Sequence, residues 1–65
     1  MKVIITEVKI GWFKNEYSKI REFDEWKYEY LPVIDDVLFI NDEQYKVLQR
    51  SFHCIDIVQI YVRKV

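Results

Sequence analysis

The sequence predicts a mainly β protein: five short strands that curl into a small barrel or a strongly curled antiparallel sheet, with one short helical segment near residues 15–22. Three observations lead to this fold class. Short runs of β-branched and aromatic residues alternate with polar ones, as in half-buried strands. Apolar residues make up 51% of the chain, which suits a packed core and not a disordered tail. Residues 1–65 form a single domain, because so short a chain has no room for two cores.

The first strand is predicted over residues 2–10, which are rich in β-branched side chains. Because side chains alternate across a strand, Val3 and Ile5 lie on one side and Ile4 and Val8 on the other. Both sides are therefore apolar. A small barrel has only one interior, so one of the two sides requires a cover.

The segment that follows departs from the period of two. Phe13, Tyr17 and Ile20 recur at the i, i+4 and i+7 spacing of one helix face, and Asn15 is a good N-cap residue. We therefore expect a short helical segment over residues 15–22. Its apolar face is one candidate for the cover that the first strand requires.

A second strand is predicted over residues 25–30, where Trp26, Tyr28 and Tyr30 alternate with charged residues. Pro32 ends this strand, because proline cannot donate a hydrogen bond to a neighbouring strand. The charged side is mixed in sign and suits solvent. We interpret the aromatic side as an edge of the core.

Three further strands are predicted in the second half of the chain. Residues 37–40 form a short strand, residues 41–44 a polar hairpin turn, and residues 45–52 the next strand. A bend at residues 53–54 leads into the last strand, residues 55–65. These three strands form a meander.

About a quarter of the chain carries a further pattern: Leu31-Pro32-Val33-Ile34-Asp35-Asp36-Val37-Leu38-Phe39-Ile40, followed by Tyr45-Lys46-Val47. It resembles a pattern in small SH3-like barrels of bacteria and their phages, which runs Pro, any residue, aliphatic, Gly, Asp, a strand, a polar turn and Tyr-any-Val. Asp35 stands where that pattern has Gly. The resemblance implies an SH3-like barrel, and it implies an accessory protein of a phage or mobile element that acts on a host protein. It transfers no catalytic residue.

Residues that carry chemistry are scarce, so we expect no enzyme, no cofactor and no metal site. Cys54 and His53 are the only cysteine and histidine, and neighbours on a strand point to opposite faces. The carboxylate pairs at residues 35–36 and 42–43 are typical of turn chemistry.

The charges nearly cancel, with 10 basic and 11 acidic side chains and a net charge of −1. This balance disfavours a sequence-independent grip on nucleic acid. The alternative function is a small barrel that binds single-stranded nucleic acid through a strand face carrying Lys46, Leu48, Arg50 and Phe52. No apolar run approaches the roughly 20 residues of a membrane span. We expect a cytoplasmic protein without membrane contact.

The surplus of apolar strand faces is the main functional clue. It indicates a non-enzymatic protein-interaction module, for which a homodimer is the simplest form and the partner is otherwise unknown. The candidate interaction surface comprises Val3, Ile5, Trp12, Tyr28, Ile57 and Tyr61.

Overall fold

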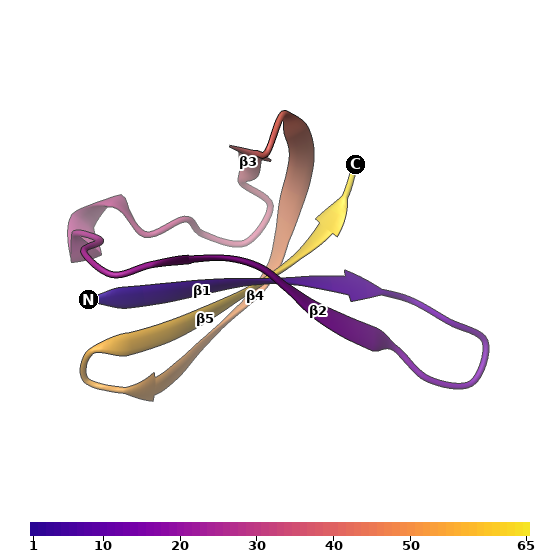
Figure 1. Ribbon diagram of the computed structural model, residues 1–65, viewed down its shortest axis with the longest axis horizontal. Coiled ribbons are helices and arrows are strands. Elements are labelled where there is room, and N and C mark those ends of the chain that lie inside the picture. The colour runs from indigo at the N-terminus through magenta and orange to yellow at the C-terminus, as the bar shows by residue number, and fades with distance from the viewer.

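The computed structural model describes residues 1–65 and contains one strongly curled sheet, a half-barrel (Figure 1). Its strands are β1 (Lys2–Lys9), β2 (Glu16–Phe23), β3 (Val37–Ile40), β4 (Glu43–Cys54) and β5 (Ile57–Lys64). They lie side by side in the order β2-β1-β5-β4-β3, so β2 and β3 are the edges. The prediction of a mainly β protein with five curled strands is confirmed.

The sheet is mixed, which corrects the expected antiparallel arrangement. β1 and β5 run parallel, with Val3 opposite Val58 and Ile5 opposite Ile60, and all other neighbours are antiparallel. Parallel neighbours require a long connection, and the whole of β2, β3 and β4 lies between these two strands in sequence.

The predicted helix at residues 15–22 is wrong, because this segment forms β2. In its antiparallel pairing with β1, Ile5 lies opposite Arg21 and Thr6 lies opposite Lys19, so Ile20 is an extra residue in a β-bulge. The extra residue breaks the alternation of side chains. The bulge accounts for the three-residue spacing from Tyr17 to Ile20, whereas the four-residue spacing from Phe13 to Tyr17 runs from the β1–β2 loop into the strand.

The predicted strand at residues 25–30 is also wrong. Residues 28–30 form a single 3-10 turn, and no strand pairs with the segment. The main chain of Trp26 instead pairs with Met1, with the Trp26 N–H donating to the Met1 carbonyl oxygen at 2.9 Å. Trp26 is half-buried and packs edge-on against Phe23, with ring centroids 5.0 Å apart. Tyr28 and Tyr30 are 66% and 69% exposed, so only one member of the aromatic row contacts the core.

The core lies on one face of the sheet, which we call the core face. Its completely buried side chains come from the three central strands: Val3, Ile5, Val47, Val58, Ile60 and Val62. Leu31, Ile40 and Tyr45 complete the cluster. Leu31 belongs to the connection between β2 and β3. This irregular segment therefore helps to cover the core face, which the half-barrel leaves open.

The second half of the chain follows the predicted meander with shifted bounds. The strand predicted at residues 37–40 is confirmed, whereas β4 is longer than residues 45–52 and β5 begins after a turn at residues 55–56. Asn41 and Asp42 connect β3 to β4 with φ angles of 53° and 65°. A two-residue loop with both φ angles positive is a type I′ turn, whose twist matches that of the strands.

Asp35 also has a positive φ angle, 77°. This is the position at which the SH3-like pattern has glycine, the residue that adopts such a conformation most readily. The Asp35 carboxylate forms an ion pair with the Lys46 ammonium at 3.3 Å. The carboxylate of the next residue, Asp36, accepts a hydrogen bond from the Val33 N–H at 2.9 Å. Local side-chain contacts therefore hold a turn that lacks glycine.

Candidate interaction site

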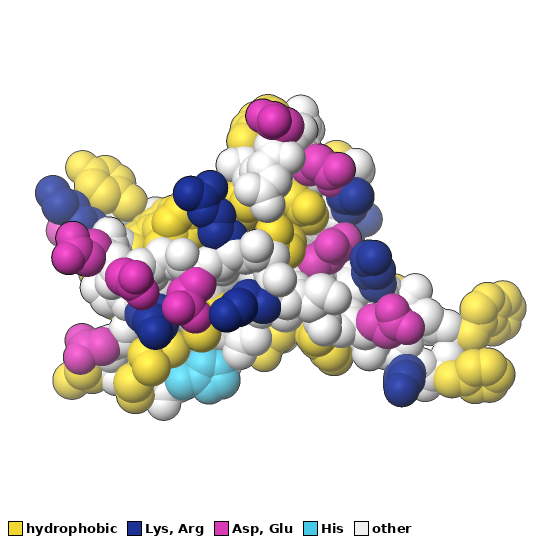
Figure 2. Space-filling view, in the orientation of Figure 1, with side chains coloured by type: hydrophobic (Ala, Val, Ile, Leu, Met, Phe, Trp, Pro, Cys, Tyr) yellow, Lys and Arg dark blue, Asp and Glu magenta, His cyan; other side chains and the backbone are white.

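The β1–β2 hairpin extends beyond the rest of the sheet (Figure 1). It exposes apolar side chains at its end. We define the hairpin tip as Ile10, Trp12 and Phe13, which are 76%, 99% and 102% exposed. Figure 2 shows hydrophobic side chains at the right-hand end of the molecule, where Figure 1 places this loop. The two largest of them make essentially no contact with the rest of the chain.

Gly11 is required by the shape of this loop. A Cβ atom at position 11 would lie 2.5 Å from the carbonyl oxygen of Lys14, which is closer than real Cβ atoms come. The chain bends at Trp12 and Phe13, which lie between Gly11 and Lys14. The close approach of the Gly11 and Lys14 main chains thus shapes the loop, and its aromatic side chains do not contribute to that contact.

The six predicted surface residues do not form one surface. Val3 and Ile5 are completely buried, which corrects their assignment, because they pack in the core cluster with Leu31 and with the β5 side chains beside them. Ile57 and Tyr61 are half-buried on the opposite face. Tyr28 is exposed in the 3-10 turn. Trp12 alone lies at the hairpin tip.

Sequence reasoning missed Phe13 and Ile10 as tip residues, because Phe13 was placed on a helix face. The signal that was present is Gly11, the only glycine of the chain, immediately before an aromatic pair. A glycine that ends a strand favours a turn, and a turn places its side chains in solvent.

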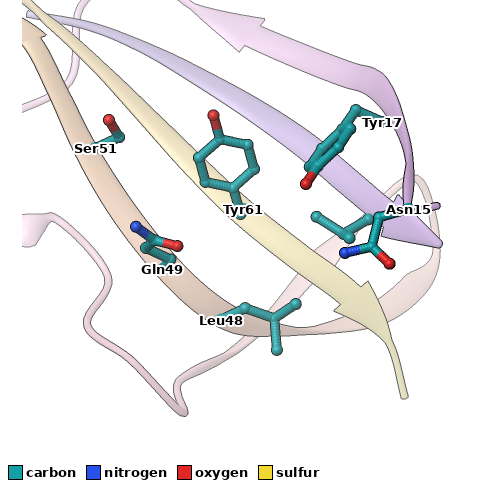
Figure 3. Close-up of a pocket in the computed structure, with 7 residues that line it drawn as sticks. Asn15, Tyr17, Leu48, Gln49, Ser51 and Tyr61 are labelled. Carbon is teal, nitrogen blue, oxygen red and sulfur yellow. The ribbon is translucent and has the colours of Figure 1, made fainter. Parts of the chain in front are cut away.

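The opposite face of the sheet, which we call the outer face, carries a pocket of about 340 Å³ (Figure 3). Its lining comes from β1, β2, β4, β5 and the β1–β2 loop: Val8, Asn15, Tyr17, Leu48, Gln49, Ser51 and Tyr61. The Tyr17 and Tyr61 rings meet edge to face, with centroids 5.9 Å apart. A register shift between Val47 and Gln49 leaves Leu48 unpaired in the ladder, in a bulge beside the pocket.

A chain of hydrogen bonds crosses the outer face beside the pocket. The Gln59 amide donates to Thr6 Oγ1 at 2.9 Å, and His53 Nε2 donates to Gln59 Oε1 at 2.7 Å. The first bond satisfies the buried Thr6 hydroxyl, which is only 4% exposed. These hydrogen bonds connect side chains of β1, β5 and β4 across the outer face.

The alternative function, binding of single-stranded nucleic acid, relied on one basic face of β4. The bulge at Leu48 divides this face. Lys46 lies opposite Arg63 on the outer face, whereas Arg50 lies opposite Ile60 on the core face. The Arg50 guanidinium is 5.7 Å from the centre of the Phe52 ring, at the rim of the core. The four residues therefore do not form a single platform, which corrects that part of the prediction.

The perturbed ionisable groups lie at the β3–β4 hairpin and the end of β5. Burial raises the pKa of Tyr45, and the negative charge of Glu43 raises it further. The pKa of Lys64 is raised by its hydrogen bond to the Glu43 carboxylate, at 2.7 Å. Nowhere in the chain do three His, Cys, Asp or Glu side chains gather in a way that suits a metal ion, and none of its helical segments is long and apolar enough to cross a membrane.

Comparison with known proteins gives no relative: no family model, no curated sequence and no solved structure matches this chain. The resemblance to SH3-like barrels therefore stays a prediction.

Proposed function

We propose that this protein is a non-enzymatic protein-interaction module that binds its partner through the hairpin tip. The observation that carries the proposal is the nearly complete exposure of Trp12 and Phe13 in the loop between β1 and β2. Aromatic side chains of this size bury about 150–250 Å² each when covered, and they dominate the energetics of interfaces. Covering both side chains with a partner would therefore contribute strongly to the free energy of binding.

A second copy of the chain is the simplest partner. In a twofold dimer the same patch contacts itself, so two hairpins lying side by side would each cover the tip of the other. Lys9 and Lys14 flank the tip and form no ion pair within the chain, which favours acidic groups around the tip's binding site. Glu16, which lies opposite Lys9 in the β1–β2 pairing, is an acidic group that a second copy would bring.

A host protein is the other form of the same proposal, as the resemblance to phage barrels implies. Such a partner would present an apolar groove with an acidic rim. The tip is the contact in both cases, so both are tested by comparing the tip with an exposed position on β3.

The experiment compares the double variant Trp12→Ser/Phe13→Ser with Phe39→Ser, which removes a side chain that is 73% exposed on β3. We expect the wild type and the Phe39→Ser variant to dimerise in sedimentation velocity and the tip variant to remain monomeric. For a host partner, a photo-crosslinking amino acid at position 13 should form an adduct that the same group at position 39 does not.

The proposal fails if the wild type is monomeric at every concentration and position 13 forms no adduct that position 39 lacks. Binding of oligo-dT that depends on the tip and weakens steeply with salt would instead favour the single-stranded nucleic-acid alternative.

A further inference from the structure

The outer-face pocket offers five polar side chains that make no hydrogen bond within the protein. They are the amides of Asn15 and Gln49 and the hydroxyls of Tyr17, Ser51 and Tyr61. In Figure 3 Tyr61 lies between Gln49 and Ser51 on one side and Tyr17 and Asn15 on the other. Donors and acceptors from β2, β4 and the β1–β2 loop therefore surround one aromatic ring.

The lining carries no charge. Charged residues make up 32% of the chain, yet none of the seven lining residues is Lys, Arg, Asp or Glu. An ionic ligand would lose hydration there without gaining a counter-charge, which is unfavourable. The ligand that suits the pocket is therefore neutral. Val8, Leu48 and the two tyrosine rings supply the apolar contacts.

We propose that this pocket binds the base of a nucleoside. An Asn or Gln amide presents an acceptor and a donor next to each other, which matches the paired donor and acceptor on the edge of a nucleobase. A tyrosine ring offers a face on which a base stacks, and stacking tolerates any base because each has a π-face. The pocket volume of about 340 Å³ lies in the range of small-molecule sites.

This binding site differs in kind from a single-stranded nucleic-acid groove. Such grooves depend on cations that follow the phosphates, so their affinity falls steeply with salt. The pocket offers no cation, and the base alone supplies the recognition. Adenosine and adenosine 5′-monophosphate should therefore bind with similar affinity, and salt should have little effect. The inference does not depend on the hairpin tip, since Trp12 and Phe13 do not line the pocket.

The test is a titration of the ¹⁵N-labelled protein with adenosine, in which the side-chain amide signals are followed by NMR. We expect saturable shifts at Asn15 and Gln49. Asn41 and Gln44 lie in the β3–β4 hairpin, away from the lining residues, and provide internal controls. Signals of these two should not move.

Two matched variants locate the binding. Gln49→Ala removes a lining amide, whereas Gln44→Ala removes an exposed amide from the same strand outside the pocket. We expect the first to weaken adenosine binding about fivefold or more and the second to leave it unchanged. Tyr61→Leu keeps an apolar side chain and removes the stacking face, so it should also weaken binding by about tenfold. Dispersed amide spectra of each variant show that it is folded.

Three results would overturn the inference. The first is the absence of saturable shifts at Asn15 and Gln49. The second is binding of the monophosphate that is more than about tenfold tighter than that of adenosine and is lost at high salt, because phosphate contacts would then dominate. The third is that glucose produces the same shifts at the same concentration, because the pocket would then accept any neutral polar solute.

Discussion

The two hairpins of this protein are built in opposite ways. The β3–β4 hairpin turns in two residues, Asn41 and Asp42, and the strand that it leads into is tied to β5 by the Glu43–Lys64 ion pair at 2.7 Å. The β1–β2 hairpin turns over residues 10–15, with no ion pair in the loop and two aromatic side chains in solvent.

The difference separates folding from function. The β3–β4 turn is as short as a hairpin allows, and its polar residues suit its conformation. The β1–β2 loop is longer than the connection of its strands requires, and its apolar residues contribute nothing to the core. A small domain has little stability to spare. These side chains are the basis of the proposed contact outside the chain.

The largest expected effect contrasts the base of the β1–β2 hairpin with its tip. Ile5 is completely buried, so Ile5→Ala should lower the free energy of unfolding by about 2–5 kcal/mol and leave much of so small a protein unfolded. Phe13→Ser should change it by less than about 0.5 kcal/mol. Urea denaturation followed by circular dichroism, at a concentration that keeps the chain monomeric, measures both. Equal losses for the two variants would mean that the tip packs against the chain in solution.

Sequence patterns located this fold well where pairing is regular. The β1 and β3 strands and the turn after β3 follow from their own residues, because β-branched runs and an Asn-Asp pair act locally. The two failures have a common cause, since each depends on which segment lies alongside. A bulge at Ile20 breaks the period of two in β2, and the row Trp26, Tyr28, Tyr30 alternates without any neighbouring strand.

The candidate site was predictable only in part. Trp12 follows from its place after Gly11. The pocket does not, because its residues come from four strands and a loop whose order in the sheet depends on the parallel pairing of β1 with β5. Val3 and Ile5 were placed on the surface for the same reason: the sequence shows two apolar sides of β1, and only the fold shows which side packs into the core cluster with Leu31.

A smaller effect is expected at the β3–β4 turn. Asp42 has a φ angle of 65°, which glycine adopts without strain, so Asp42→Gly should stabilise the protein by about 0.5–1 kcal/mol and raise the melting temperature by about 2–8 °C. Asp35→Gly relieves a φ angle of 77° but also removes the ion pair with Lys46, and its gain should be smaller. Thermal denaturation compares the two. A loss of stability in Asp42→Gly would show that the carboxylate at position 42 contributes more than the relief of strain.

The smallest effect is confined to alkaline pH and concerns the same hairpin. The pKa of Tyr45 in the folded protein is raised above its ordinary value of 10.0 by burial and by Glu43. Below pH 10 the tyrosine is protonated in both the folded and the unfolded chain, and stability is unaffected. As the pH rises above 10, the unfolded chain loses this proton while the folded protein retains it, so stability falls until the folded pKa is reached. The raised pKa of Lys64 acts in the same direction.

In urea denaturation across this pH range, Tyr45→Phe should therefore lose stability less steeply than the wild type. Tyr28→Phe, at an exposed tyrosine, should follow the wild type. Identical slopes for all three would mean that Tyr45 is solvated in the folded protein.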